Sequence, residues 1–74
     1  MSVTLRPMGF LKDYVGGQEQ VELVAGPTVA EMLVGLGIPP ALIALVTRGQ
    51  DLSSKDYRPQ DGETITVVPM VHGG

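Results

Sequence analysis

Residues 28–40 read TVAEMLVGLGIPP, and this stretch predicts a short amphipathic helix whose start and end are both marked. Thr28 and Glu31 match a capping box, in which the Thr hydroxyl and the Glu carboxylate each accept a hydrogen bond from an otherwise unpaired backbone N–H. Apolar side chains follow at helical spacing and give the helix one apolar face: Val29, Met32, Leu33 and Leu36. Gly37 supplies a left-handed C-terminal stop, and Pro39–Pro40 prevents the helix from continuing.

Two strand patterns precede the predicted helix. Apolar and polar residues alternate around Val3–Leu5 and again around Val21–Leu23, which is typical of strands with one solvated face. The two segments are close in sequence, so we expect them to pair antiparallel. Phe10 and Tyr14 lie in the connection between them, in a segment too short to form a domain, and we expect both rings to cap the core.

Three further strands are predicted after the helix. The apolar run at residues 42–46 is interpreted as a buried central strand, with a turn of helix over residues 40–43 as the alternative. Any residue of this run on the face away from the helix would form a partner-binding patch. A short strand around Leu52 follows, and the last strand covers residues 64–68 and closes at Pro69, which cannot donate to a ladder.

The predicted order is therefore β-β-α-β-β-β, which indicates an α+β fold. One amphipathic helix can cover one face of one sheet, so we expect a two-layer sandwich with Tyr57 pointing inward. A chain of 74 residues has room for one core. We assign residues 1–69 to that domain and residues 70–74 to a flexible C-terminal tail.

Composition excludes several classes of function. The formal charge is -3, and the five Lys and Arg residues are scattered, whereas nucleic-acid binders cluster their cations. No apolar run approaches the ~18 residues of a membrane span, and no signal-peptide pattern is present, so we expect a cytoplasmic protein. The chain has no Cys, one His and no paired carboxylates at a useful spacing, so we expect neither a metal site nor an independent catalyst.

The C-terminal end carries the chemistry. After the last strand only Met70, Val71, His72, Gly73 and Gly74 remain, and from Pro69 onward they reach at most ~20 Å when extended, enough to enter another protein's active site. Glycines without Cβ let the backbone slide through a narrow channel and approach a nucleotide phosphate closely. A carboxylate must become a mixed anhydride, such as an acyl-adenylate, before a nucleophile can attack it. An ATP-using partner would supply that chemistry, and this chain would supply the acyl group.

Taken together, these features resemble the ubiquitin-like β-grasp sulfur carriers, the family of the molybdopterin synthase small subunit and the thiamine-thiazole sulfur carrier. The resemblance covers nearly the whole chain and is carried by residues 28–33, 36–39, 61–63 and 68–69, with Gly73-Gly74 at the end. It implies a mixed sheet in which the first and last strands pair in parallel at the centre. It also implies that an activating enzyme adenylates the terminal glycine, which is then converted to a thiocarboxylate that donates sulfur.

Transferred to this sequence, the resemblance implies that Gly74 is the acyl-adenylate and thiocarboxylate site. Gly73, His72, Val71 and Met70 would contact the channel of the partner. The implied partners are a ubiquitin-activating-like adenylating enzyme, a sulfur donor protein and an acceptor synthase. No cofactor is expected to bind this chain, because ATP is used by the activating partner.

Two departures from the family pattern bear on the choice of partner. Many members have Asn-Gly in the hairpin where this chain has Thr47-Arg48-Gly49, which alters the turn without touching the tail. His72 stands where a smaller residue is common, which leaves the matching activating enzyme open. The connection at residues 8–19 is long for the thiazole carrier and nearer to the molybdopterin synthase small subunit, so the resemblance favours the larger subunit of molybdopterin synthase over thiazole synthase as the acceptor. Sulfur delivery to tRNA or to an amino acid also stays open.

Two other functions stay open on the sequence. The chain could be a protein modifier, joined through Gly74 to a lysine of another protein as an isopeptide. It could also be a non-covalent β-grasp binding module that happens to end in Gly-Gly. Appending one alanine after Gly74 separates these classes, because a docking module tolerates the addition and a carboxylate carrier does not.

Overall fold

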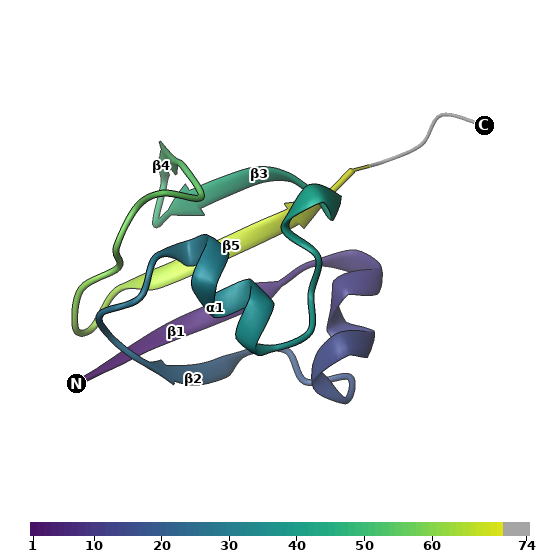
Figure 1. Cartoon of the computed structure of the whole chain (residues 1–74), viewed down its shortest axis with the longest axis horizontal. Coiled ribbons are helices and arrows are strands. Elements are labelled where there is room, and N and C mark those ends of the chain that lie inside the picture. The colour runs from purple at the N-terminus through teal and green to yellow at the C-terminus, as the bar shows by residue number, and fades with distance from the viewer. Residues whose placement is uncertain (71–74) are drawn as a thin grey trace.

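A computed structural model describes residues 1–70 of the chain. Its helices and strands are β1 (Ser2–Pro7), the 3-10 helix η1 (Gly9–Val15), β2 (Val21–Val24), α1 (Val29–Gly35), the 3-10 helix η2 (Pro40–Leu42), β3 (Ile43–Arg48), β4 (Asp51–Ser53) and β5 (Thr64–Pro69). The strands form one sheet in the order β2-β1-β5-β3-β4, with α1 lying across one face (Figure 1). The predicted order β-β-α-β-β-β is confirmed, with two short 3-10 helices added to it.

The centre of the sheet is a parallel pair. β1 and β5 run in the same direction, with Leu5 opposite Ile65 and Pro7 opposite Val67, while every other neighbouring pair of strands is antiparallel. The mixed sheet implied by the family resemblance is therefore present. β5, the last strand of the described residues, therefore runs through the middle of the sheet and not along an edge.

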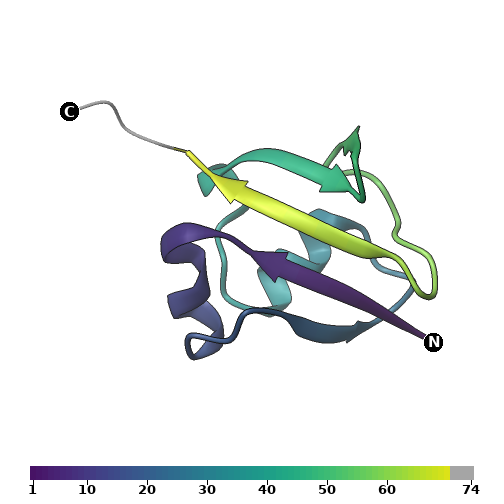
Figure 2. The same cartoon turned by 180° about the vertical axis from the view of Figure 1, so that it is seen from behind.

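The core lies between α1 and the sheet. Alternation along β1 and β5 places Val3, Leu5, Ile65 and Val67 inward, and all four are fully buried. The helix contributes its apolar face, and the buried cluster is completed by Leu11, Val29, Met32, Leu33, Ile38, Ile43 and Val46. Seen from behind, the opposite face of the sheet carries no helix within residues 1–70 (Figure 2).

The predicted capping box is present at the start of α1. The backbone N–H of Glu31 donates to Oγ1 of Thr28 at 3.1 Å, and the N–H of Thr28 donates to Oε1 of Glu31 at 2.8 Å. This second bond is the main reason that the pKa of Glu31 lies below its ordinary value. The first helical N–H groups are also satisfied, since those of Val29 and Ala30 donate to carbonyls of the loop that precedes β5. That loop is thereby fastened to the helix.

The end of α1 follows the prediction as well. Gly37 has φ +81°, the left-handed conformation that glycine adopts without a Cβ penalty. Leu36 is half-buried, and it packs against the core from the end of the helical stripe. The predicted inward position of Tyr57 is confirmed, because its side chain is half-buried and packs against the core cluster.

Two predictions about the core are wrong. Phe10 and Tyr14 remain 48% and 41% exposed, because η1 turns Leu11 and Val15 toward the core in their place. The run at 42–46 is not a buried central strand. Its first part belongs to η2, as the alternative interpretation had it, and β3 lies beside the edge strand β4. A register shift between Ile43 and Leu45 leaves Leu45 exposed on the sheet face away from α1.

Candidate functional site

The carboxyl end of β5 is the candidate site, because it is where the predicted carrier tail begins. Met70 is the last described residue, and its backbone N–H donates to the carbonyl of Leu42 at 2.8 Å. One residue earlier, Pro69 is buried and lies opposite Ile43 of β3. The η2–β3 junction therefore fixes one side of the exit, and the side chain of Met70 stays 43% exposed.

The opposite side of the exit is fixed by the start of η1. The N–H of Met8 donates to the carbonyl of Val67 at 3.0 Å, which ties the end of β1 to β5. Gly9 follows with φ +56°, and a Cβ built on it would lie only 3.3 Å from Cγ of Pro69. Glycine is thus favoured here by its left-handed conformation, and an added Cβ would also need Pro69 to shift by a few tenths of an ångström. The 3-10 helix lies close against the ring of Pro69 as a result.

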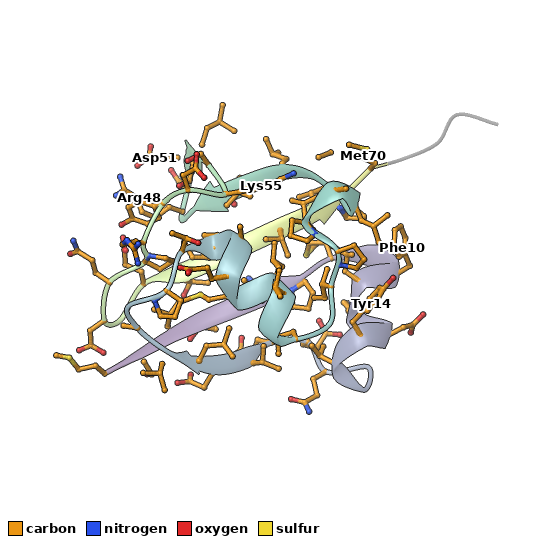
Figure 3. The ribbon with its side chains drawn as sticks, viewed as in Figure 1. Phe10, Tyr14, Arg48, Asp51, Lys55 and Met70 are labelled. Atoms are coloured by element: carbon orange, nitrogen blue, oxygen red, sulfur yellow. The ribbon has the colours of Figure 1, made fainter. Side chains whose placement is uncertain are left out.

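Exposed apolar side chains gather around this exit, and we call them the exit rim: Met8, Phe10, Tyr14, Leu45 and Met70. Figure 3 shows Phe10, Tyr14 and Met70 at the same end of the molecule, beside the point where β5 ends. Leu45 joins them on the outer sheet face, where it lies opposite Val68. Each of the five is between 40% and 48% exposed, so each leaves part of its apolar surface in contact with solvent.

The charged groups with shifted pKa values lie away from the exit. In Figure 3, Arg48 and Asp51 stand at the other end of the sheet from Phe10 and Tyr14. There the hydroxyl of Tyr57 donates to Glu63, and this bond is the largest cause lowering the pKa of Glu63.

Arg48 completes the same cluster. Its guanidinium donates to the Tyr57 hydroxyl at 3.1 Å and stacks over the ring at 5.1 Å from its centroid. The hydrogen bond to Tyr57 is the main cause raising the pKa of Arg48. Glu63 also accepts from the N–H of Gln60 at 2.7 Å, so the cluster holds the loop before β5 in place. The contacts among Arg48, Tyr57 and Glu63 therefore indicate that this cluster stabilises the fold.

Within residues 1–70 no group of three His, Cys, Asp or Glu residues is placed to hold a metal ion. Over the same residues no helix is both long enough and apolar enough to cross a membrane. Of the predicted site residues, Met70 lies at the exit, whereas Val71, His72, Gly73 and Gly74 lie outside the described residues. Their roles stay predictions.

Sequence reasoning misses most of the exit rim. It anticipates Leu45 only conditionally, as a member of an apolar run with one face free. It places Met8 simply in a loop, and it expects Phe10 and Tyr14 to cap the core. The spacing in this segment gives no signal, because Leu11 and Val15 are four residues apart and so are Phe10 and Tyr14.

Comparison with known proteins decides the family. The model of the ThiS family matches residues 8–74, which include β5, the exit and the end of the chain. The chain belongs to the ThiS family. As a ThiS-family protein it is a member of the ubiquitin-like β-grasp sulfur carriers, as the sequence predicted.

Solved structures share the fold of this ThiS-family chain. SAMP1 from Haloferax volcanii is 21% identical, with 100% of both chains covered and a TM-score of 0.69. Urm1 from Trypanosoma brucei is 18% identical over 99% of this chain and 95% of its own, also with a TM-score of 0.69.

A third structure is a complex of subunits 1 and 2 of molybdopterin-converting factor from Helicobacter pylori 26695. A chain of that complex matches this ThiS-family chain at 21% identity and a TM-score of 0.61. The match covers 100% of this chain and 100% of the matched chain. These likenesses confirm the β-grasp fold. No curated protein sequence matches the chain significantly.

Proposed function

We propose that this protein is a sulfur carrier whose C-terminal carboxylate, on Gly74, is the reacting group. The observation that supports the proposal most is the ThiS-family match, which extends through residue 74 and so includes the Gly-Gly end. The geometry of the exit is consistent with it, because a central strand leads to the tail and exposed apolar side chains surround the point of departure.

The proposed reaction has two steps, both carried out by partners. In the first, a carboxylate oxygen of Gly74 attacks the α-phosphorus of ATP, and the bond to pyrophosphate breaks. In the second, a sulfide sulfur supplied through a sulfur donor protein attacks the acyl carbon, and the bond to AMP breaks. The product is a thiocarboxylate in which one carboxylate oxygen has been replaced by sulfur.

The chain's own contribution is binding and presentation. We propose that the exit rim docks on the adenylating enzyme while Met70, Val71, His72 and Gly73 pass through its channel. The cost of ordering this segment would be offset by burial of the rim. Full burial of an exposed apolar side chain contributes about 1.5–3 kcal/mol, and the rim side chains, which are 40–48% exposed, would each gain roughly half of that. The protein then acts as a co-substrate and not as an independent catalyst.

We further propose that the acceptor is the larger subunit of a molybdopterin synthase, with a thiazole synthase as the alternative. This preference rests on the long connection between β1 and β2, which folds as η1 and contributes Phe10 and Tyr14 to the exit rim. Affinity purification of the tagged protein from its own cells tests this part. Recovery of a thiazole synthase in place of the larger synthase subunit would overturn it.

The reaction itself is tested by mass spectrometry of the intact protein after incubation with its activating enzyme, ATP and sulfide. We expect a mass increase equal to the difference between one sulfur and one oxygen atom. A variant with one alanine appended after Gly74 should show no increase, and a matched control with one alanine added before Met1 should react normally. If only carboxylate is found with all components active, the carrier proposal fails.

The same samples discriminate the modifier hypothesis. Conjugation through Gly74 would give adducts with other proteins that resist reductant and disappear with the alanine-appended variant. Such adducts in the absence of any thiocarboxylate would replace the carrier proposal with the modifier one.

A further inference from the structure

The turn before β5 carries a reactive pair of residues and lies at the end of that strand opposite the exit rim. Asp61 and Gly62 form this turn, beside the N-terminal end of β1 (Figures 1 and 2). Gly62 has φ +86°, a left-handed conformation that favours glycine, and an added Cβ would meet nothing within 4 Å. Because glycine has no side chain, nothing hinders an attack of its backbone nitrogen on the side chain of Asp61.

The reaction open to such a pair is formation of a cyclic imide. The backbone nitrogen of Gly62 attacks Cγ of Asp61, so that an N–C bond forms and a Cγ–O bond breaks. The oxygen leaves as water, taking the amide proton and one proton from solvent. A second water molecule then opens the ring at either carbonyl. One opening restores aspartate, and the other gives isoaspartate, in which the main chain passes through the former side chain.

The fold holds both reacting groups through a single residue, Ser2. The backbone N–H of Ser2 donates to Oδ1 of Asp61 at 2.8 Å, and the N–H of Gly62 donates to the carbonyl of Ser2 at 2.8 Å. Both bonds must break before the nitrogen can approach Cγ. One hydrogen bond is worth a factor of roughly 2–10 in an equilibrium, so the two together should slow the reaction roughly tenfold or more.

These two bonds lie at the outer end of the β1–β5 pairing. On the other side of β1, the N–H of Ala25 donates to the carbonyl of Met1, and hydrogen-bonded positions alternate along an antiparallel pair, so the backbone groups of Ser2 face β5. The next bond toward the core runs from the N–H of Thr4 to the carbonyl of Glu63 at 3.0 Å. Strand ends open more easily than strand centres, and so the turn can be released while the core stays folded.

We propose that Asp61-Gly62 is a site of spontaneous isomerisation to isoaspartate, which Ser2 holds closed and which reacts when the start of β1 detaches. The product has one extra main-chain carbon between residues 61 and 62. The carboxylate and the N–H of the turn then no longer match the spacing of the two backbone groups of Ser2, and the turn cannot close again. The proposal does not depend on the chemistry of Gly74.

The test compares the full-length protein in buffer and in a urea concentration that unfolds it. Isoaspartate is measured by methyl transfer from S-adenosylmethionine with an isoaspartyl methyltransferase as reagent, and its position by electron-transfer fragmentation of peptides. We expect it at residue 61, forming roughly tenfold or more slowly in buffer than in urea. Asp13, Asp51 and Asp56 are internal controls, because Tyr or Leu follows each of them. Equal rates in the two conditions, or no isoaspartate at residue 61 in urea, would overturn the proposal.

Ser2→Pro tests the holding residue directly. It removes the N–H that donates to Asp61, and proline is tolerated at the first residue of a strand. The matched control is Thr28→Ala, which loses the helix cap but leaves both bonds of Ser2 in place. We expect Ser2→Pro to react several-fold faster in buffer than its measured loss of stability explains, and Thr28→Ala to show no such excess. If both rates follow stability alone, the reaction requires global unfolding and the role of Ser2 is refuted.

Asp61→Asn gives a second readout that leaves Ser2 unchanged. The chain contains no other Asn, so imide formation with loss of ammonia, followed by hydrolysis, changes the intact mass from this position alone. The side-chain oxygen of the amide can still accept from Ser2, and we expect the same suppression in buffer relative to urea. Equal rates of mass change in the two conditions would contradict the proposal even if Ser2→Pro does not fold.

Discussion

Replacement of Gly9 by alanine tests whether η1 holds the exit of β5 in place. Gly9 has φ +56°, and its added Cβ would lie 3.3 Å from Cγ of Pro69. The left-handed conformation costs an L-residue roughly 1–2 kcal/mol. The close contact between the new Cβ and Pro69 destabilises the fold by about 1 kcal/mol more. This is the lower end of the range for overpacking, because Pro69 needs to shift by only a few tenths of an ångström.

The expected loss for Gly9→Ala is therefore about 2–3 kcal/mol in the free energy of unfolding. With an unfolding entropy near 2.1 cal/mol/K per residue, a chain of 74 residues has about 155 cal/mol/K, so the melting temperature should fall by roughly 13–19 °C. Urea titration monitored by far-UV circular dichroism measures the free energy, and a thermal scan measures the shift.

Gly16→Ala is the matched control. Gly16 also has a left-handed φ, +68°, but an added Cβ would have no neighbour within 4 Å, so this variant should lose only the conformational part of about 1–2 kcal/mol. The steric part should vanish in a Gly9→Ala, Pro69→Ala double variant, giving a favourable coupling of about 1 kcal/mol. Equal losses for Gly9→Ala and Gly16→Ala, with no coupling to Pro69, would refute the argument that η1 braces the exit.

Other perturbations follow from the capping box, the charged cluster and the exit rim. Thr28→Ala should cost about 1 kcal/mol by urea titration, whereas Thr28→Ser should keep most of the cap. The pKa values of Glu31 and Glu63 are lowered, the first chiefly by a backbone N–H and the second chiefly by a phenol hydroxyl, so both stabilise the fold above the unfolded-state pKa of about 4.3. That stabilisation is lost as the pH falls through the lowered pKa values. Thermal scans between neutral and acidic pH should therefore show the melting temperature decrease below about pH 4.3, and the decrease should be smaller in Glu63→Gln. Leu45→Glu should slow adenylation and cost roughly 1 kcal/mol of stability, because Leu45 is only 40% exposed, whereas Leu52→Glu, on the same sheet face but at the edge strand β4, should leave adenylation unchanged.

Elements with local signals at both ends could be predicted from the sequence. The helix is the clearest case, because Thr28 with Glu31 marks its start and Gly37 marks its end, and the structure has both. The strand faces of β1 and β5 followed from alternation, since each has one buried and one outer side. These features depend on neighbours within a few residues, and so the local pattern determines them.

The pairing of distant strands and the burial of individual side chains could not be predicted in the same way. The parallel contact of β1 with β5 joins residues sixty positions apart, such as Thr4 and Thr64, and no local pattern specifies it. It was expected only from the family resemblance. The prediction that residues 42–46 are buried was wrong for a related reason. A register shift between Ile43 and Leu45 changes which side chains of the strand face the core.

In the candidate site, too, some residues could be identified from the sequence and others only from the fold. The role proposed for Gly73-Gly74 could be inferred from the sequence because it depends on these two residues and not on how the chain folds. The exit rim could not, because Met8 and Leu45 lie far apart in sequence and are brought to one end by the pairing of β1, β5 and β3.

The position of β5 has a mechanical consequence for a carrier. In the proposed carrier role, a partner bound to the tail would pull on Met70, which is hydrogen-bonded to Leu42 and follows a strand paired on both sides. Opening this strand would break both the β1 and the β3 ladders and expose Ile65 and Val67, so a load on the tail is resisted by the core.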